Sequence, residues 1–295
     1  MSTLRNLQAQ SRWLLNYAAN VTSETGEDGI LHKILELLPG KNQRCIEFGA
    51  WDGKHLSNTY NLIATMGYRG VLIEPRRARF LELQRMHDPQ KHILINAFVG
   101  FGESDSLDAM LANYPIPADP DVLSIDIDGN DYYAWAAINR IRAKIVVIEF
   151  NPTIANAVYF VQKRDPKVMQ GASPAALVEL GQKKGYELIA VTAWNLIFVD
   201  ARYYDLFHIP DNSLEVMREE KYVRHVFMGT DGKVLLEYAG EFGSVPLHWH
   251  YPIRLYESSL QPLPKILQYY KPDYDRFRLF LFRVHWRLRR LLHGC

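Results

Sequence analysis

The stretch SIDIDGNDYYAW, residues 124–135, contains acidic side chains at a spacing that could bind a metal ion. It places Asp126, Asp128 and Asp131 within six residues. Carboxylates this close together either bind a hard divalent cation or stabilise a turn by accepting backbone N–H groups. An EF-hand is excluded, because its turn glycine would fall on Asp131 and its closing glutamate on Ala137. We therefore interpret the stretch as a polar loop that follows a strand.

A second polar stretch, IEFNPT, supplies Glu149 and Asn151 at the end of another apolar run. Because the carboxyl ends of parallel strands meet at one edge of a sheet, we expect these two side chains to lie near Asp126 and Asp128. Carboxylate and amide oxygens suit Mg²⁺, Mn²⁺ or Ca²⁺ better than zinc. Such an ion lowers the pKa of a substrate hydroxyl. The alternative is that Asp126 contacts a cofactor amino group while Asp128 stabilises a turn.

The stretch IEFGAWDGKH, residues 46–55, joins an apolar run to a helical pattern and contains Gly49 and Gly53. Glycines at such a junction let a ligand approach the backbone and the N-terminus of the helix. A dinucleotide-binding loop has the pattern G-x-G-x-x-G, because the pyrophosphate presses on its second glycine. Trp51 lies between the glycines here and would exclude a pyrophosphate, so we expect a nucleoside ligand without one. The alternative is that the glycines serve only a tight turn.

Two further side chains lie where a nucleoside would be held. Glu74 ends the next apolar run, where an acidic side chain accepts hydrogen bonds from both ribose hydroxyls. Asn96 ends the run after that and is placed to reach an adenine edge. An arginine of the following RRAR, residues 76–79, is the alternative partner for Glu74.

A histidine pair stands in PLHWHYP, towards the end of the sequence. His248 and His250 alternate, so on a strand they would point to the same face. They could contact substrate or contribute to a metal site, but no third ligand stands nearby in the sequence. The spacing favours a hydrogen-bonded surface pair.

Alternating β-rich runs and helical patterns must position these residues. Apolar runs predict seven strands, at residues 44–49, 70–75, 92–99, 121–127, 144–150, 186–192 and 195–200. Apolar residues spaced at three and four predict helices between them, at residues 56–67, 77–86, 131–142 and 175–185. The sequence therefore predicts a doubly wound, Rossmann-like α/β sheet with N-terminal helices and a C-terminal extension.

The chain is expected to divide into four segments. In order, these are a helical segment at residues 1–40, the sheet domain at 41–205, a substrate-side extension with a hairpin turning at 230–232 in 206–260, and a linker with a basic helix in 261–295. The last segment is distinctive in charge. Residues 276–295 hold six arginines and no acidic residue, whereas the net charge of the whole chain is +1.

The basic segment is amphipathic as a helix. One stripe of a helical wheel contains Phe277, Phe280, Leu281, Val284, Leu288 and Leu291, and outside the stripe lie Arg276, Arg283, Arg287 and Arg290. This pattern over residues 276–292 indicates a helix that lies on an anionic membrane surface. Docking on protein is the alternative. A nucleic-acid partner is disfavoured, because the basic character is local.

Three motifs, EFGAWDGKHLSNT, LIEP and DIDGNDYYAW, together resemble those of class I S-adenosylmethionine-dependent methyltransferases, in particular the FkbM-type branch. The resemblance covers roughly residues 20–200. It implies S-adenosylmethionine as the cofactor and a hydroxyl of a sugar or natural product as the methyl acceptor. The cofactor positions that follow from the resemblance and from the strand ends are Glu47, Gly49, Asp52, Gly53, Ser57, Glu74, Asn96 and Asp126.

The acidic stretch is also similar to that of metal-dependent O-methyltransferases, where an acid after strand four and an acid with an amide after strand five hold magnesium. This similarity implies Asp128, Glu149 and Asn151 as ligands, with Asp126 as a ligand or a support. Some of these relatives have a histidine three residues after the first acid, where this sequence has Asp131. The general base is therefore left open among Asp131, Tyr132, His248 and His250.

Composition adds the expected compartment. The two cysteines, Cys45 and Cys295, form no metal-ligand or disulfide pattern, and no apolar run reaches the length of a membrane span. We expect a cytoplasmic protein, peripheral at the inner face of the membrane, and an oligomer is compatible with the sequence.

The function that the sequence predicts is S-adenosylmethionine-dependent O-methylation of a saccharide or glycolipid, assisted by Mg²⁺ or Mn²⁺, with no nucleic-acid partner. The alternative is a noncatalytic membrane-associated binding or scaffold module that keeps the fold. A nucleotide-dependent oxidoreductase is disfavoured by Trp51.

Overall fold

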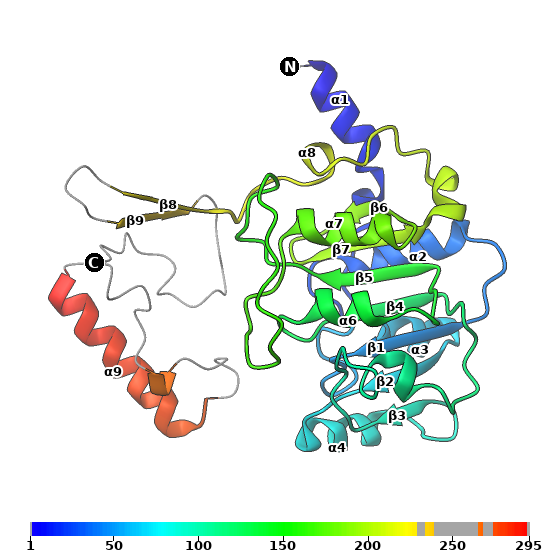
Figure 1. Cartoon of the computed structure of the whole chain (residues 1–295), viewed down its shortest axis with the longest axis horizontal. Coiled ribbons are helices and arrows are strands. Elements are labelled where there is room, and N and C mark those ends of the chain that lie inside the picture. Colours follow the sequence, from blue (N-terminus) through cyan, green and yellow to red (C-terminus); the bar gives the residue numbers. More distant parts are fainter. Residues whose placement is uncertain (1, 229–233, 239–264, 268–273, 294–295) are drawn as a thin grey trace. The chain divides into compact units, whose positions relative to one another are not determined.

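The computed structural model describes residues 2–228, 234–238, 265–267 and 274–293 (Figure 1). The chain divides into two compact units, Met1–Glu220 and Lys221–Cys295. The first unit contains a sheet, the glycine stretch at residues 46–55 and the acidic stretch at residues 124–135. The second contains a hairpin and the basic helix.

The sheet of the first unit has seven strands in the order β3-β2-β1-β4-β5-β7-β6. The strands are β1 (Arg44–Phe48), β2 (Arg69–Ile73), β3 (Ile93–Ile95), β4 (Val122–Ile125), β5 (Ile145–Glu149), β6 (Tyr186–Val191) and β7 (Asn195–Asp200). Each overlaps one of the seven predicted runs, and β2 begins one residue before its run. Helices lie on both faces of the sheet, so the predicted Rossmann-like architecture is confirmed (Figure 1).

The sheet is mixed rather than wholly parallel. Strands β1 to β5 pair in parallel, whereas β7 runs antiparallel to both of its neighbours, β5 and β6. Only residues 192–194 separate β6 from β7. A parallel crossover needs a dozen or more residues, so this short connection permits only a hairpin.

The helices of this unit include the four predicted between the strands, with a late start of α3, at Tyr60, and one exception that ends early. They are α1 (Ser2–Ser11), α2 (Glu27–Leu37), α3 (Tyr60–Met66), α4 (Arg77–Met86), α5 (Leu107–Met110), α6 (Asp131–Ala137), α7 (Pro174–Lys183) and α8 (Leu214–Met217), with 3₁₀ turns η1 (Trp13–Tyr17) and η2 (Ala201–Phe207). On one face α6 packs beside α5 and α7, and elsewhere α2 packs beside α3.

The exception is α6, which ends at Ala137 although the apolar spacing predicts a helix to residue 142. The Asp108 carboxylate accepts the N–H groups of Asn139, Arg140 and Ile141. These bonds offer the backbone an alternative to helical hydrogen bonds, so the chain leaves the helix.

The core lies between the helices and the sheet. The β7 strand is buried along its whole length, as a strand covered on both faces should be. Trp135 of α6 is 1% exposed and packs on Phe198 of β7, with ring centroids 5.1 Å apart. This packing fixes α6, and with it the acidic residues that precede and begin the helix.

The N-terminal segment is fastened to the sheet by buried carboxylates at the start of α2. Asp28 Oδ2 accepts the N–H groups of residues 21–23. Glu27 Oε1 accepts hydrogen bonds from Thr192 Oγ1 at 2.6 Å and from Asn195 Nδ2 at 3.0 Å. The start of α2 therefore lies against the β6–β7 connection, and Asp28 holds residues 21–23 to it.

The second unit is described in part. It contains the antiparallel pair β8 (Arg224–Met228) and β9 (Val234–Tyr238), the turn η5 (Lys265–Leu267) and α9 (Arg276–His293). The predicted hairpin is confirmed as a strand pair, while its predicted turn at residues 230–232 lies outside the described residues. His248 and His250 lie outside them too.

Candidate cofactor and metal site

Three strands bring their carboxyl ends together at one edge of the sheet. Strand β1 lies between β2 and β4. Beyond β1, the Gly49 N–H donates to the Ile73 carbonyl at 3.1 Å. The Asp126 N–H donates to the Phe48 carbonyl at 3.3 Å. The loop at residues 49–59 therefore starts between the ends of β2 and β4, where the sequence predicts a ligand.

Both predicted glycines are needed by the packing of the protein itself. Gly49 has a φ of +81°, and a Cβ there would lie 1.5 Å from the Asp126 carbonyl oxygen. Gly53 has a φ of +80°, and a Cβ there would lie 2.7 Å from the ring of His87. The tight turn that the sequence leaves open as an alternative is thus present, whatever ligand the loop holds.

Glu47 holds the loop in place. Its carboxylate accepts hydrogen bonds from Ser57 Oγ at 2.6 Å, the Asn58 N–H at 2.9 Å and Thr59 Oγ1 at 2.8 Å. The side chain is buried, and this burial raises the pKa of Glu47. Two predicted cofactor residues, Glu47 and Ser57, therefore bond to each other, and the structure gives them a positioning role.

Glu74 lies directly beyond β2, as predicted for a ribose-binding acid. It is 3% exposed, and its Oε2 accepts the Trp51 N–H at 3.0 Å while its Oε1 accepts the Arg76 N–H at 2.8 Å. Burial raises the pKa of Glu74, against the opposing influence of these bonds and of nearby guanidinium groups. A carboxylate has about four lone-pair directions, so two backbone bonds leave about two lone pairs of Glu74 unused.

Trp51 is held in an unusual conformation beside Glu74. Its φ is +51°, which is uncommon for a bulky residue. The guanidinium carbons of Arg79 and Arg76 lie 4.3 Å and 5.1 Å from its ring centroid. This stacking holds the indole against the start of α4. In the sequence, Trp51 stands between the two glycines, where a dinucleotide loop needs a small residue.

The remaining predicted cofactor residues make local bonds. Asp52 Oδ1 accepts the N–H groups of Lys54 and His55 at 2.9 Å and 2.7 Å. Asn96 Nδ2 donates to the carbonyl oxygens of Glu74 and Pro75 at 2.8 Å and 3.0 Å. These two bonds fix the chain beyond β2, while Asn96 itself is exposed to solvent.

An acidic cluster stands beside the loop, at the ends of β4 and β5. Carboxylate oxygens of Asp126, Asp131 and Glu149 lie within 4.8 Å of one another. Burial, and then the negative charges of the neighbours, raise the pKa of Asp126 and of Glu149. Burial also raises the pKa of Asp131 to about 6. Oxygen ligands at this separation suit a hard divalent cation, which would remove the repulsion.

The membership of the cluster differs from the predicted ligand set. Asp131, which the sequence suggests as a candidate general base, belongs to the cluster. Its two carboxylate oxygens also accept the N–H groups of Ile127 and Gly129, both at 2.8 Å. Asp128 has a φ of +58° in the turn and is not in the cluster.

Asn151 lies beyond β5 but is engaged elsewhere. Its Nδ2 donates to the Gln170 carbonyl at 2.8 Å, and its Oδ1 accepts from the N–H and Oγ1 of Thr153 at 3.0 Å and 2.6 Å. The structure thus gives Asn151 a role in shaping the long loop after β5.

Two buried amide oxygens near the cluster were not predicted. Asn195 faces Glu149 across the β5–β7 register and is 6% exposed. Its Oδ1 is without a hydrogen-bond partner among the described residues, and the same holds for the Oδ1 of Asn130, which is 4% exposed. A buried acceptor without a donor is costly, so such oxygens indicate a missing cation or donor.

The loop at residues 150–173 closes the site on one side. Asn130 Nδ2 donates to the carbonyls of Asp165 and Val168, both at 3.2 Å, and Tyr133 Oη donates to the Gln162 carbonyl at 2.7 Å. Aromatic rings gather here, since Tyr133 lies 5.5 Å from the ring centroids of both Tyr132 and Phe101.

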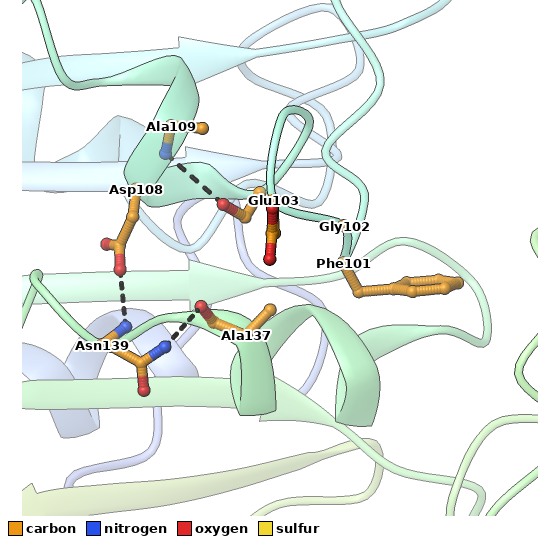
Figure 2. A pocket seen from close by; sticks show the side chains of 8 residues that line it. Phe101, Gly102, Glu103, Asp108, Ala109, Ala137 and Asn139 are labelled. Carbon is orange, nitrogen blue, oxygen red and sulfur yellow. Dashed lines mark hydrogen bonds between the residues drawn. The ribbon is translucent and has the colours of Figure 1, made fainter.

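An open pocket of about 460 Å³ lies beside Phe101 (Figure 2). Its walls are Phe101, Gly102, Glu103, Ser106, Asp108, Ala109, Ala137 and Asn139. None of the predicted cofactor or metal residues lines it. Figure 2 shows Asp108 and Asn139 hydrogen-bonded to each other along one wall, with the Phe101 ring pointing away from them.

The fold and site define a Rossmann-like α/β protein with a carboxylate-lined edge. No protein-family model matches the sequence, and no curated protein matches it. Several solved structures resemble it weakly, and many of them are methyltransferases. One is an S-adenosylmethionine-dependent methyltransferase from Aquifex aeolicus, with a TM-score of 0.35 and 10% identity over 67% of this chain and 95% of that chain.

Two others show the same level of similarity. The 1,6-didemethyltoxoflavin-N1-methyltransferase of Burkholderia thailandensis gives a TM-score of 0.38 and 11% identity over 59% of this chain and 76% of that chain. The CMeT domain of the citrinin polyketide synthase gives 0.38 and 12% over 59% and 51% of the two chains, so the match spans about half of that chain. With TM-scores below 0.5, the chemistry of the site is inferred from the residues of this chain alone.

Proposed function

We propose that the protein transfers a methyl group from S-adenosylmethionine to a hydroxyl of a saccharide, in a glycan, a glycolipid or a natural product, with a divalent cation at the acidic cluster. The observation that carries the proposal is the position of two acidic groups on either side of the β1 loop. Glu74 follows β2, and Asp126 follows β4.

The separation of these groups fits the cofactor. Neighbouring strands lie about 4.8 Å apart, so the ends of β2 and β4 are separated by roughly 10 Å. A nucleoside with a short side chain can place its ribose at Glu74 and its reactive end near Asp126. A pyrophosphate is disfavoured at the same place by Trp51, which is stacked with Arg79. These features favour a methyl donor over a dinucleotide.

The residues of the loop divide the work of binding. Glu74 accepts the two ribose hydroxyls with the lone pairs that its backbone bonds leave over. Glu47 keeps the loop at residues 49–59 in shape through Ser57 and Thr59. Exposed Asn96 is the side chain placed to meet the adenine edge.

The acidic cluster fits a divalent cation, with Asp126, Asp131 and Glu149 as the carboxylate ligands. The buried Asn195 Oδ1, without a partner among the described residues, supports this assignment. A divalent cation supplies, when bound, the lowering of a hydroxyl pKa and the orientation of that hydroxyl. The pKa of Asp131, raised to about 6 by burial, would fall when a divalent cation binds, so this proposal gives Asp131 the role of a ligand.

The acceptor class is supported by the aromatic group beside the cluster. Tyr132 and Tyr133 come from α6, directly after Asp131, and Phe101 lies against Tyr133. Aromatic faces are flat apolar surfaces, of the kind that pack on the carbon face of a sugar ring. Arg164 lies 4.9 Å from the Phe101 ring centroid and adds a donor for hydroxyl or phosphate oxygens.

Calorimetric titration with S-adenosylmethionine tests the cofactor assignment. The wild-type protein should bind it, and Glu74→Ala should bind it at least about tenfold more weakly, since one charge-assisted hydrogen bond contributes about 1.5–3 kcal/mol. Glu36→Ala, on the surface of α2, is the matched control and should bind as the wild type does. Absence of binding to the wild type, or equal binding by Glu74→Ala, would reject the proposal.

Turnover separates catalysis from the noncatalytic alternative. Release of S-adenosylhomocysteine should depend on a saccharide acceptor and on Mg²⁺ or Mn²⁺. Tyr133→Ala should raise KM for the acceptor more than it lowers kcat, because the ring binds substrate rather than reacting. Binding of S-adenosylmethionine without release, across nucleotide sugars, oligosaccharides and glycolipids, would favour a binding or scaffold module.

A further inference from the structure

The second unit ends in a long basic helix that the proposed methyl transfer does not use. The helix α9 (Arg276–His293) has 18 residues, six of them arginines and none acidic. In the described part of the chain, no helix combines the length and the apolar character that crossing a membrane would take. The exposed side chains of the helix indicate what it contacts.

One stripe of α9 leaves large apolar side chains in contact with solvent. Phe277 and Phe280 are both 61% exposed, Leu288 is 53% exposed and Leu291 is 81% exposed. Val284, between them, is 36% exposed. Steps of three and four residues connect the five positions, so they form one continuous stripe along the helix.

A different side of the helix is already packed within the same unit. Phe282 is 7% exposed and forms a small cluster with Leu267 of η5, with Tyr274 and Leu281 packed against it. The rings of Tyr274 and Phe282 lie edge to face, 5.9 Å apart. The helix therefore has its own packing partner on one side, and the exposed stripe is not the face that this partner covers.

Charge indicates what covers the stripe. Arg276, Arg283 and Arg287 are exposed and fall next to the stripe on a helical wheel. Asp275 caps the start of the helix, where its Oδ1 accepts the Arg278 N–H at 2.7 Å. An apolar stripe flanked by arginines complements the boundary between acyl chains and anionic headgroups.

We propose that α9 attaches the protein to an anionic membrane surface, with Phe277, Phe280 and Leu288 in the acyl boundary and the arginines at lipid phosphates. An apolar groove of a protein would not need six arginines. A nucleic acid would not need five exposed apolar side chains. The proposal is independent of methyl transfer, because it rests on the second unit alone.

Sedimentation of the full-length protein with vesicles tests this proposal. Binding should be strong to phosphatidylcholine mixed with phosphatidylglycerol, weak to phosphatidylcholine alone, and should fall as salt is added. Arg283→Gln/Arg287→Gln should bind about 30-fold more weakly, at about fivefold per arginine. Equal binding to both kinds of vesicle would overturn the proposal.

Two further variants complete the test. Phe277→Ser/Phe280→Ser keeps every charge and should lose vesicle binding, because the apolar stripe is broken. Arg85→Gln/Lys91→Gln removes the same charge from α4 and the loop after it, and should bind as the wild type does. Unchanged binding in the Phe277→Ser/Phe280→Ser variant, or an equal loss in the α4 control, would contradict a specific role for α9. A loss of self-association in place of vesicle binding would also overturn it.

Discussion

The two ends of the central sheet treat buried charge in opposite ways. At the amino ends of β4 and β5, Asp121 and Lys144 are both buried and lie 2.6 Å apart. Nearby, the Asp200 carboxylate is paired with Arg142 at 2.5 Å and with Arg202 at 3.0 Å. The guanidinium groups overcome the effect of burial and lower the pKa of Asp200.

At the carboxyl ends of the same strands, acidic groups face one another. Asp126, Asp131 and Glu149 form a cluster whose pKa values are raised by burial and by mutual repulsion. Carboxylates at the amino end are thus paired with cationic groups, whereas those at the carboxyl end repel one another, which costs stability. A protein can retain such a cost where a ligand removes it, so the difference supports the proposed ligand site at the carboxyl end of the sheet.

The largest effect is expected from breaking the buried pair at the amino end. Asp121→Asn leaves the Lys144 ammonium uncompensated at 1% exposure, and the free energy of unfolding should fall by about 3–5 kcal/mol. Urea denaturation followed by circular dichroism measures this loss. Asp121→Asn combined with Lys144→Met should recover much of it. A loss below about 1 kcal/mol would show that the pair is not buried in solution.

The carboxyl end should respond to cations instead. Mg²⁺ or Mn²⁺ at about 100 times its Kd should stabilise the wild type by about 2.7 kcal/mol, because it binds only the folded cluster. Thermal denaturation with the added ion measures the effect, against NaCl at equal ionic strength. Glu149→Gln should lose the stabilisation, and the surface variant Glu36→Gln should keep it. An equal shift in Glu149→Gln would place the ion elsewhere.

Asp200→Asn should show the sign of a favourable carboxylate. Its lowered pKa means that the folded state gains stability above the unfolded pKa of about 3.9, and loses it as the pH falls through the folded value. We expect the variant to be less stable by about 1.5 kcal/mol at pH 7, because the two arginines are partly exposed. The difference from wild type should shrink as the pH falls through the folded-state pKa of Asp200. Urea midpoints at several pH values provide the measurement.

The smallest change in stability is expected from Asp126→Asn, at the carboxyl end of the sheet, and it has the opposite sign to that of Asp200→Asn. A raised pKa means that the folded state holds its proton longer, so stability is lost as the pH rises from about 3.9. Without divalent ions, Asp126→Asn should therefore be more stable than the wild type at pH 7, by about 1 kcal/mol, the usual size of a stabilising single substitution. The gain should disappear in acid. A loss of stability at pH 7 would contradict the repulsion.

The sequence predicts the sheet well, because seven runs of Val, Ile and Leu are strong local signals. It does not predict that β7 is antiparallel, since a strand buried on both faces has the same composition in either direction. It also extends α6 to residue 142, because the Asp108 carboxylate that receives the chain beyond Ala137 comes from a distant segment.

The position of the candidate site is easier to predict from the sequence than the identity of its residues. Strand ends identify Glu74, Asp126 and Glu149. The exchange of Asp128 for Asp131 depends on the turn, in which Asp128 has a φ of +58°. Asn195 escapes prediction, because its partner Glu27 is 168 positions away. The proposed contribution of His248 and His250 to the site stays a prediction, since both lie outside the described residues.

We propose that the carboxyl end of the sheet holds both a methyl donor and a divalent cation. A crystal structure with both ligands is the most direct test. Crystals of the full-length protein would be grown with S-adenosylhomocysteine and Mn²⁺, and anomalous differences would locate the metal. Ribose hydroxyls are expected at Glu74, and an anomalous peak is expected among Asp126, Asp131 and Glu149. A bound cofactor away from Glu74, or a Mn²⁺ peak remote from these carboxylates, would contradict it.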